Sequence, residues 1–197
     1  MARIRSPEKR SAIFEAAVRE IAEAGLGAPT AKIASRAGIA AGTLFTYFVN
    51  KEELLNELYL ELKSEVYARI NSNFPHKASL ERRARHIWSS YLAWAIAFPE
   101  KRKASLQLNV SDLITPATRE KTVAERSAID ATLNELENRG ALRELPPGFA
   151  AAAMAALQEA AMEFIAKQPK QRKELIERAF QVFWRATHQT PRPRKNK

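Results

Sequence analysis

The sequence predicts an all-α protein of about nine helices. Apolar residues recur every three or four positions, as they do along one face of a helix, and no run has the alternating pattern of a strand. Prolines and glycines separate these periodic segments. Of the 197 residues, 46% are hydrophobic and 27% are charged, which is the composition of a globular protein with a sizeable core.

The first helix is bounded by caps at both ends. Ser6 is a good N-cap, and Pro7 suits the first helical position because its missing N–H has no helical partner there. Gly25 can end the helix because it tolerates a left-handed backbone. The helix should bury an apolar face between these caps.

Three further helices are expected in the first third of the chain. Residues 29–37 and 41–48 predict two short helices separated by a glycine turn. Asn50 then caps a helix over residues 50–71, and Glu53 completes a pair that resembles a capping box.

The remaining helices follow from apolar periodicity and from the prolines between them. The second half of residues 79–98 is apolar nearly all round, so this helix should lie inside a bundle. Other helices are expected over residues 100–110, 117–139, 149–167 and 171–188. Residues 189–197 should be disordered, because the basic end of the chain has no apolar residue to anchor it.

The charge balance favours a polyanionic partner. Lys and Arg number 32 against 22 Asp and Glu, which gives a formal charge of +10 and favours nucleic acid over a membrane surface. The absence of cysteine excludes disulfides and thiolate chemistry, and the three histidines are scattered, so we expect neither a metal site nor a cofactor. No signal peptide or membrane span is evident, and we expect a cytoplasmic protein with no membrane partner.

The segment 29–54 predicts a helix-turn-helix. Ile33 and Ala34 should face inward, Gly38 should form the turn, and Leu44 should pack beneath it. Lys51, in the first turn of the next helix, is placed to bind a phosphate. The outer face of the second short helix should carry the residues that meet DNA, which are Ala41, Gly42, Thr43, Thr46 and Tyr47.

Residues 8–58 resemble the DNA-binding domain of TetR-family transcriptional regulators. The resemblance rests on Ile33-Ala34, Ala37-Gly38-Ile39, Gly42-Thr43-Leu44-Phe45, Tyr47-Phe48, Lys51 and Leu54. It implies that residues 41–46 read the groove and that Tyr47 and Lys51 clamp phosphates. It further implies a homodimer that binds double-stranded DNA and is released by a small-molecule effector.

The segment also departs from the family pattern. Ala40 cannot cap the recognition helix, and Phe45 lacks the hydroxyl of the usual Tyr, so we assign Phe45 to the core. Pro29 replaces the usual Thr, and Thr30 can take over part of its phosphate contact. In the basic N-terminal arm, Arg3 and Arg5 either bind DNA or remain solvated.

The middle of the chain resembles the RamR-like, multidrug-sensing subgroup of this family. The resemblance covers residues 43–63 and 87–91 and implies a pocket for aromatic, often cationic, effectors. The residues expected to line the pocket are Tyr59, Lys63, Trp88, Tyr91, Met154 and Glu159. Aromatic residues at this spacing also suit a solid core.

The last two helices are apolar on too many faces for a lone surface hairpin, which favours a two-fold four-helix dimer interface. The residues expected in it are Leu157, Ala161, Phe164, Phe180 and Trp184. We thus expect a DNA-binding domain over residues 1–50, a ligand-binding and dimerisation domain over 51–188, and a basic tail over 189–197.

The sequence predicts a ligand-responsive repressor that binds a near-palindromic operator as a dimer. One alternative is an architectural DNA-binding protein without an effector, in which the aromatic residues are solid core. Another is an all-α enzyme, but the chain lacks a nucleophile–base–orienter set and a phosphate loop, so we expect no enzymatic activity.

Overall fold

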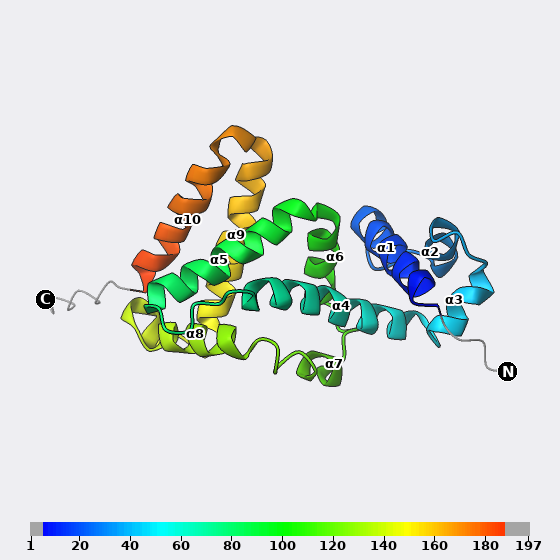
Figure 1. Ribbon diagram of the computed structural model, residues 1–197, viewed down its shortest axis with the longest axis horizontal. Helices are drawn as coiled ribbons and strands as arrows, with labels where there is room; N and C mark the ends of the chain where they lie inside the picture. Colours follow the sequence, from blue (N-terminus) through cyan, green and yellow to red (C-terminus); the bar gives the residue numbers. More distant parts are fainter. Residues whose placement is uncertain (1–5, 188–197) are drawn as a thin grey trace, which may run out of the picture. The chain divides into compact units, whose positions relative to one another are not determined.

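The computed structural model describes residues 6–187, and this part of the chain is all-helical with no strand (Figure 1). The fold class expected from the sequence is therefore confirmed. Two short 3-10 segments, η1 (Gly140–Glu144) and η2 (Pro169–Gln171), join longer helices. The α-helices are α1 (Pro7–Ala24), α2 (Thr30–Arg36), α3 (Ala41–Tyr47), α4 (Lys51–Asn71), α5 (Leu80–Ala97), α6 (Pro99–Asn109), α7 (Pro116–Glu120), α8 (Ser127–Glu137), α9 (Phe149–Lys167) and α10 (Arg172–Ala186).

The chain divides into two compact units, and each contains two separate segments. The first comprises Met1–Val66 and Ala97–Ala124, and the second comprises Tyr67–Ile96 and Glu125–Lys197. The first unit thus reaches beyond residue 50, where the sequence placed a domain boundary. It does so because α6 packs against α1 and adds Ala104 and Leu108 to the apolar core formed by α1 to α4.

The expected caps set the ends of the first helices. Ser6 Oγ accepts a hydrogen bond of 3.3 Å from the Lys9 N–H, and Gly25 has a φ of +81° and donates its N–H to the Ile21 carbonyl. Asn50 Oδ1 accepts the Glu53 N–H at 2.8 Å, while the Glu53 carboxylate accepts the N–H of Val49. The start of α4 is therefore capped from both directions.

The single helix expected over residues 117–139 is wrong. The structure has α7, then turns over residues 121–126, then α8. Thr122 is 3% exposed, and its hydroxyl donates to the Arg119 carbonyl at 2.8 Å. A buried threonine that bonds back to the preceding turn competes with helix continuation, and no proline or glycine marks this break.

The second unit is built around α5. Trp88 and Trp94 are almost fully enclosed, and the Trp88 indole N–H donates to the Ile176 carbonyl of α10 at 3.1 Å. The rings of Trp88 and Phe180 meet edge to face with centroids 5.9 Å apart. In Figure 1, α9 and α10 run beside each other, and they pack together. The apolar half of α5 is therefore packed on one side only, because Ser89, Ala93 and Ala97 on its other side are exposed.

Candidate functional site

A tight turn joins α2 to α3 in the first unit. Ile33, Ala34 and Leu44 are at most 1% exposed and form the floor of the pair. Gly38 has a φ of +68°, which favours glycine. The N–H of Ile39 donates to the Ala34 carbonyl at 3.0 Å and closes the turn. This geometry is that of a helix-turn-helix.

The outer face of α3 carries most of the residues expected there. Ala41, Gly42 and Thr46 are exposed, and Thr43 is half-buried. The Thr46 hydroxyl donates to the Thr43 carbonyl at 2.7 Å. This face is short and holds no charged side chain.

For two aromatic residues of α3, the structure reverses the burial that we predicted from the sequence. Tyr47 was expected on the outer face but is 9% exposed, and Phe45 was expected in the core but is 47% exposed. The reason is the period of the helix, because Tyr47 and Phe48 follow Leu44 by three and four residues and share its buried side. Phe45 is therefore a surface residue of α3 that the sequence analysis missed.

The Tyr47 hydroxyl ties α3 to the start of α1. It accepts a hydrogen bond of 3.1 Å from the backbone N–H of Ser6, the N-cap of α1. Its own hydrogen is not used by this bond, so the hydroxyl can still donate to an oxygen acceptor. Arg3, Arg5 and the tail 189–197 lie outside the described residues.

Cationic and hydroxyl groups lie on the helices that flank α3. Lys51 is half-buried at the first residue of α4, and Thr30 is half-buried at the first residue of α2. Lys32, which the sequence analysis did not single out, is exposed on α2 and forms no ion pair with any described residue. The sequence could have indicated Lys32, because it is the one charged residue in the first turn of α2.

An arginine fixes α2 against α1. Arg36 Nε bonds Glu20 Oε1 at 2.6 Å, and its two terminal nitrogens bond both oxygens of Glu23 at 3.0 and 2.6 Å. The hydrogen bonds that Arg36 donates to Glu23, and then the one to Glu20, raise the pKa of Arg36 above its ordinary value. Since the Glu20 side chain is 8% exposed, Arg36 is the partner that keeps this buried carboxylate satisfied.

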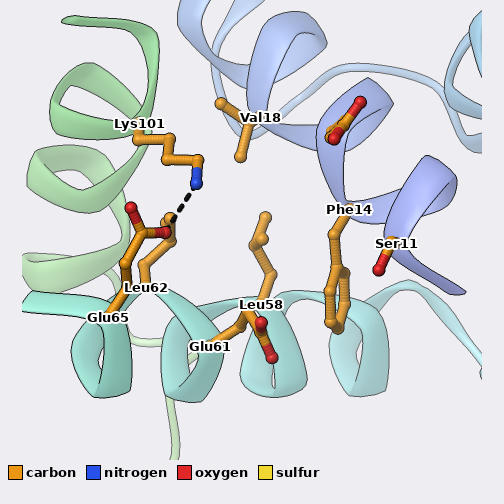
Figure 2. A pocket seen from close by; sticks show the side chains of 9 residues that line it. Ser11, Phe14, Val18, Leu58, Glu61, Leu62, Glu65 and Lys101 are labelled. Atoms are coloured by element: carbon orange, nitrogen blue, oxygen red, sulfur yellow. Dashed lines mark hydrogen bonds and ion pairs between the residues drawn. The ribbon is translucent and has the colours of Figure 1, made fainter. Parts of the chain in front are cut away.

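A small cleft of about 120 Å³ lies between α1, α4 and α6 of the first unit. Figure 2 shows its apolar floor, which includes Phe14, Val18 and Leu58. Glu65 and Lys101 form an ion pair of 2.5 Å at one end. The lining also holds Glu15 and Glu61, so it carries three carboxylates and one ammonium group. Its size and charge do not suit a large anionic ligand.

The expected effector residues of the first unit lie together on α4. Tyr59 is 6% exposed, and its ring lies 5.3 Å from Lys63 Nζ and 5.6 Å from the guanidinium carbon of Arg119. Two cationic groups therefore lie over one aromatic ring. The contact of Arg119 was not predicted from the sequence.

The expected effector residues of the second unit connect α5 to α9. The Tyr91 hydroxyl donates to Glu159 Oε1 at 2.8 Å, and Met154 is 3% exposed. Trp88 is fully enclosed, and Gln158, which the sequence analysis missed, reaches its carbonyl at 3.4 Å. These side chains combine aromatic surface with one carboxylate.

The expected dimer residues differ in exposure. Phe164 is 49% exposed, Leu157 and Trp184 are half-buried, and Ala161 and Phe180 are buried within the second unit. Helix α9 is long and apolar enough by composition to cross a membrane, although core helices of soluble proteins meet the same criteria. Within residues 6–187, no three metal-ligating side chains are grouped as a metal site would require.

Comparisons with known proteins agree with this geometry. Residues 13–58 match the family described as bacterial regulatory proteins, tetR family. Over 82 residues the chain is 34% identical to the fatty acid metabolism regulator protein of Bacillus subtilis, a match that covers 41% of this chain and 42% of that protein. A putative tetR family regulator from Shewanella sp. PV-4 is 27% identical, with a TM-score of 0.77 over 92% of this chain and 98% of that one.

Two solved structures with bound ligands share the fold. LfrR from Mycobacterium smegmatis, in complex with proflavine, is 23% identical, with a TM-score of 0.65 over 90% of this chain and 95% of that one. FadR from Bacillus subtilis, in complex with stearoyl-CoA, is 21% identical, with a TM-score of 0.63 over 90% and 97% of the two chains.

An all-helical chain that carries a helix-turn-helix shares the architecture of the solved tetR family structures. The family match over residues 13–58 and the solved Shewanella structure both support a TetR-family transcriptional regulator. They do not single out the RamR-like subgroup that the sequence suggested.

Proposed function

We propose that the protein is a cytoplasmic, ligand-responsive repressor that binds a near-palindromic operator as a homodimer. The observation that carries this proposal is the helix-turn-helix, whose α3 is exposed along one face and flanked by the cations Lys32 and Lys51. In this arrangement α3 enters the major groove, and the flanking groups bind phosphates and fix its register.

Groups at the starts of α2 and α4, together with Tyr47 of α3, bind the phosphates. Lys51 and the free N–H groups of the first turn of α4 bind one phosphate, and Thr30 and Lys32 bind another from α2. Tyr47 contributes through the hydrogen of its hydroxyl while it holds Ser6 in place. Arg3 and Arg5, which lie outside the described residues, are proposed to bind the adjacent minor groove.

Homodimerisation is proposed through α9 and α10. Helix α9 leaves Phe164 and a row of alanines exposed, and such a surface favours burial against a second copy. Leu157, Ala161 and Trp184 lie on the same two helices, and Phe180 supports them from the core. A two-fold dimer would set the recognition helices about 34–36 Å apart, one DNA turn.

Two effector classes are supported by different contacts. Tyr91 and Glu159 offer an aromatic ring beside a carboxylate, which suits the flat aromatic cations expected of a RamR-like, multidrug-binding protein, and proflavine in LfrR is such a ligand. Tyr59, with Lys63 and Arg119 over its ring, instead suits an anionic group, and stearoyl-CoA in FadR is an anionic ligand.

Helix α4 provides the coupling between effector and DNA. Lys51 and Lys63 lie on it about 18 Å apart, at about 1.5 Å per residue. An effector that displaces Tyr59 would move this helix and the phosphate grip of Lys51. By linkage, operator DNA must weaken effector binding by the same factor as effector weakens DNA binding.

Selection of bound duplexes from random DNA tests the first part of the proposal. We expect a near-palindromic site and a binding constant that falls steeply with salt. Lys51→Ala should weaken binding to every sequence and flatten the salt dependence by about one unit of log–log slope, whereas Lys170→Ala, on η2 in the other unit, should leave the slope unchanged. If Lys51→Ala leaves the slope of the salt dependence unchanged, Lys51 does not bind a phosphate.

Titration with proflavine and with stearoyl-CoA tests the second part. Quenching of tryptophan fluorescence by one ligand, together with release of the operator, identifies the effector class. If neither these ligands nor a wider panel changes fluorescence or DNA affinity, the protein is an architectural DNA-binding protein with a solid core.

A further inference from the structure

The segment that faces DNA lacks every side chain that reads bases through paired hydrogen bonds. Residues 37–49, here called the reading segment, contain no Arg, Lys, Asn, Gln, Asp or Glu. Arg and Lys recognise guanine, and Asn and Gln recognise adenine, through such bonds. This is notable in a chain with a formal charge of +10. Base recognition by α3 must therefore use other groups.

The few hydroxyl groups of the reading segment are partly engaged within the protein. Thr46 donates its only hydroxyl hydrogen to the Thr43 carbonyl at 2.7 Å. Tyr47 is buried, and its hydroxyl accepts the Ser6 N–H. Since the Oγ of Thr46 is turned to its own helix, its γ-methyl remains for contact with a partner.

The largest side chains that the reading segment exposes are apolar. Phe45 is 47% exposed and Val49 is 76% exposed, and Ala41 and Gly42 are exposed in the same segment. On the major-groove edges of the four bases, the C5-methyl of thymine is the apolar group. The chemistry of this face therefore matches one base feature.

We propose that the reading segment recognises thymine C5-methyl groups, with Phe45 and the Thr46 methyl as the side chains that determine specificity. This inference rests on the proposed function, because it requires that α3 enters the major groove. The phosphate contacts of Lys32 and Lys51 supply affinity, and the methyl contacts choose the sequence.

Replacement of single thymines by deoxyuridine in the selected operator tests the proposal, because deoxyuridine lacks only the methyl group. We expect at least one thymine in each half-site at which the replacement weakens binding about fourfold, the effect of losing one buried methyl. At that position 5-methylcytosine should bind about fourfold better than cytosine, since it restores the methyl without the pairing pattern of thymine.

Variants of the protein show which side chain contacts the thymine methyl group. For Phe45→Ala or Thr46→Ser, the ratio between thymine and deoxyuridine operators should fall toward one at the position read by that residue. Thr46→Val keeps a methyl and should retain the ratio. Lys51→Ala should weaken binding to both operators equally and leave the ratio unchanged.

The outcomes separate this inference from the proposed function. If no duplex is selected and binding is absent, the proposed function fails. If a specific, salt-dependent operator is found but no deoxyuridine replacement changes the affinity, methyl recognition is wrong and DNA regulation stands. A Phe45→Ala protein that keeps the full thymine preference would likewise overturn the role of Phe45.

Discussion

Gly42→Ala should make the protein more stable and worse at binding DNA. A Cβ added at Gly42 meets no atom within 4 Å, and the residue lies in α3. The fold therefore does not require glycine at this position. A glycine that costs helix stability without a packing reason suggests that a partner approaches the backbone here.

The magnitudes follow from helix propensity and from packing. Alanine is better than glycine in a helix by about 0.5–1 kcal/mol, and for a chain of this size that raises Tm by about 1–4 °C. On the DNA side, a methyl inserted into a close interface costs about 1–3 kcal/mol, which is about a five- to 150-fold loss of affinity. The two effects have opposite signs, so a general loss of fold cannot explain both.

Circular dichroism melting and fluorescence anisotropy on the selected operator measure the two effects on one protein preparation. Gly27→Ala is the matched control, because a Cβ there also meets no atom within 4 Å and the residue lies outside the reading segment. It should keep full DNA affinity. If Gly42→Ala is stabilised and binds the operator as tightly as the wild type, the start of α3 does not approach the groove closely.

Three other variants probe the rest of the molecule. Arg85 lowers the pKa of Glu177 by its hydrogen bond, so Glu177 stabilises the fold above its unfolded pKa and loses this effect as pH falls through its folded pKa. Glu177→Gln should therefore melt below the wild type at pH 7 and match it once pH falls below the ordinary carboxylate range; an equal difference at both pH values would contradict this. Phe164→Lys should shift sedimentation from dimer toward monomer with the helical signal intact, and an unchanged dimer would place the interface elsewhere. Arg36→Met should speed hydrogen exchange over α2 because Glu20 loses its partner, and unaltered exchange would show that the apolar floor alone holds α2.

The sequence was sufficient for helices that have strong caps. Ser6 with Pro7 fixed the start of α1, and Gly25 fixed its end, because each of these residues satisfies or suits a specific backbone position. The break between α7 and α8 could not be predicted in this way. It depends on the burial of Thr122, and burial is a property of the folded chain.

The candidate site was predicted in outline but not in its aromatic residues. Helix α3 runs only from Ala41 to Tyr47. It has too few turns for the spacing of its apolar residues to show which face is buried. The buried Leu44 supplies the missing reference, because it places Tyr47 on the inner side and Phe45 on the outer side. Phe45, which we assigned to the core because it departs from the family pattern, is thus the largest exposed side chain of α3.

Separation of charge from apolar contact in the helix-turn-helix has a measurable consequence. The cations Lys32 and Lys51 flank the reading segment, and the exposed groups of Phe45 and Thr46 lie within it. Phosphate contacts weaken steeply with salt because they release counterions, whereas burial of a methyl does not release any. Raising the salt concentration should therefore weaken binding to thymine and deoxyuridine operators in parallel, with a constant ratio between them. A ratio that declines with salt would indicate that the thymine preference comes from electrostatic contacts or groove shape, and the methyl assignment would then lose its basis.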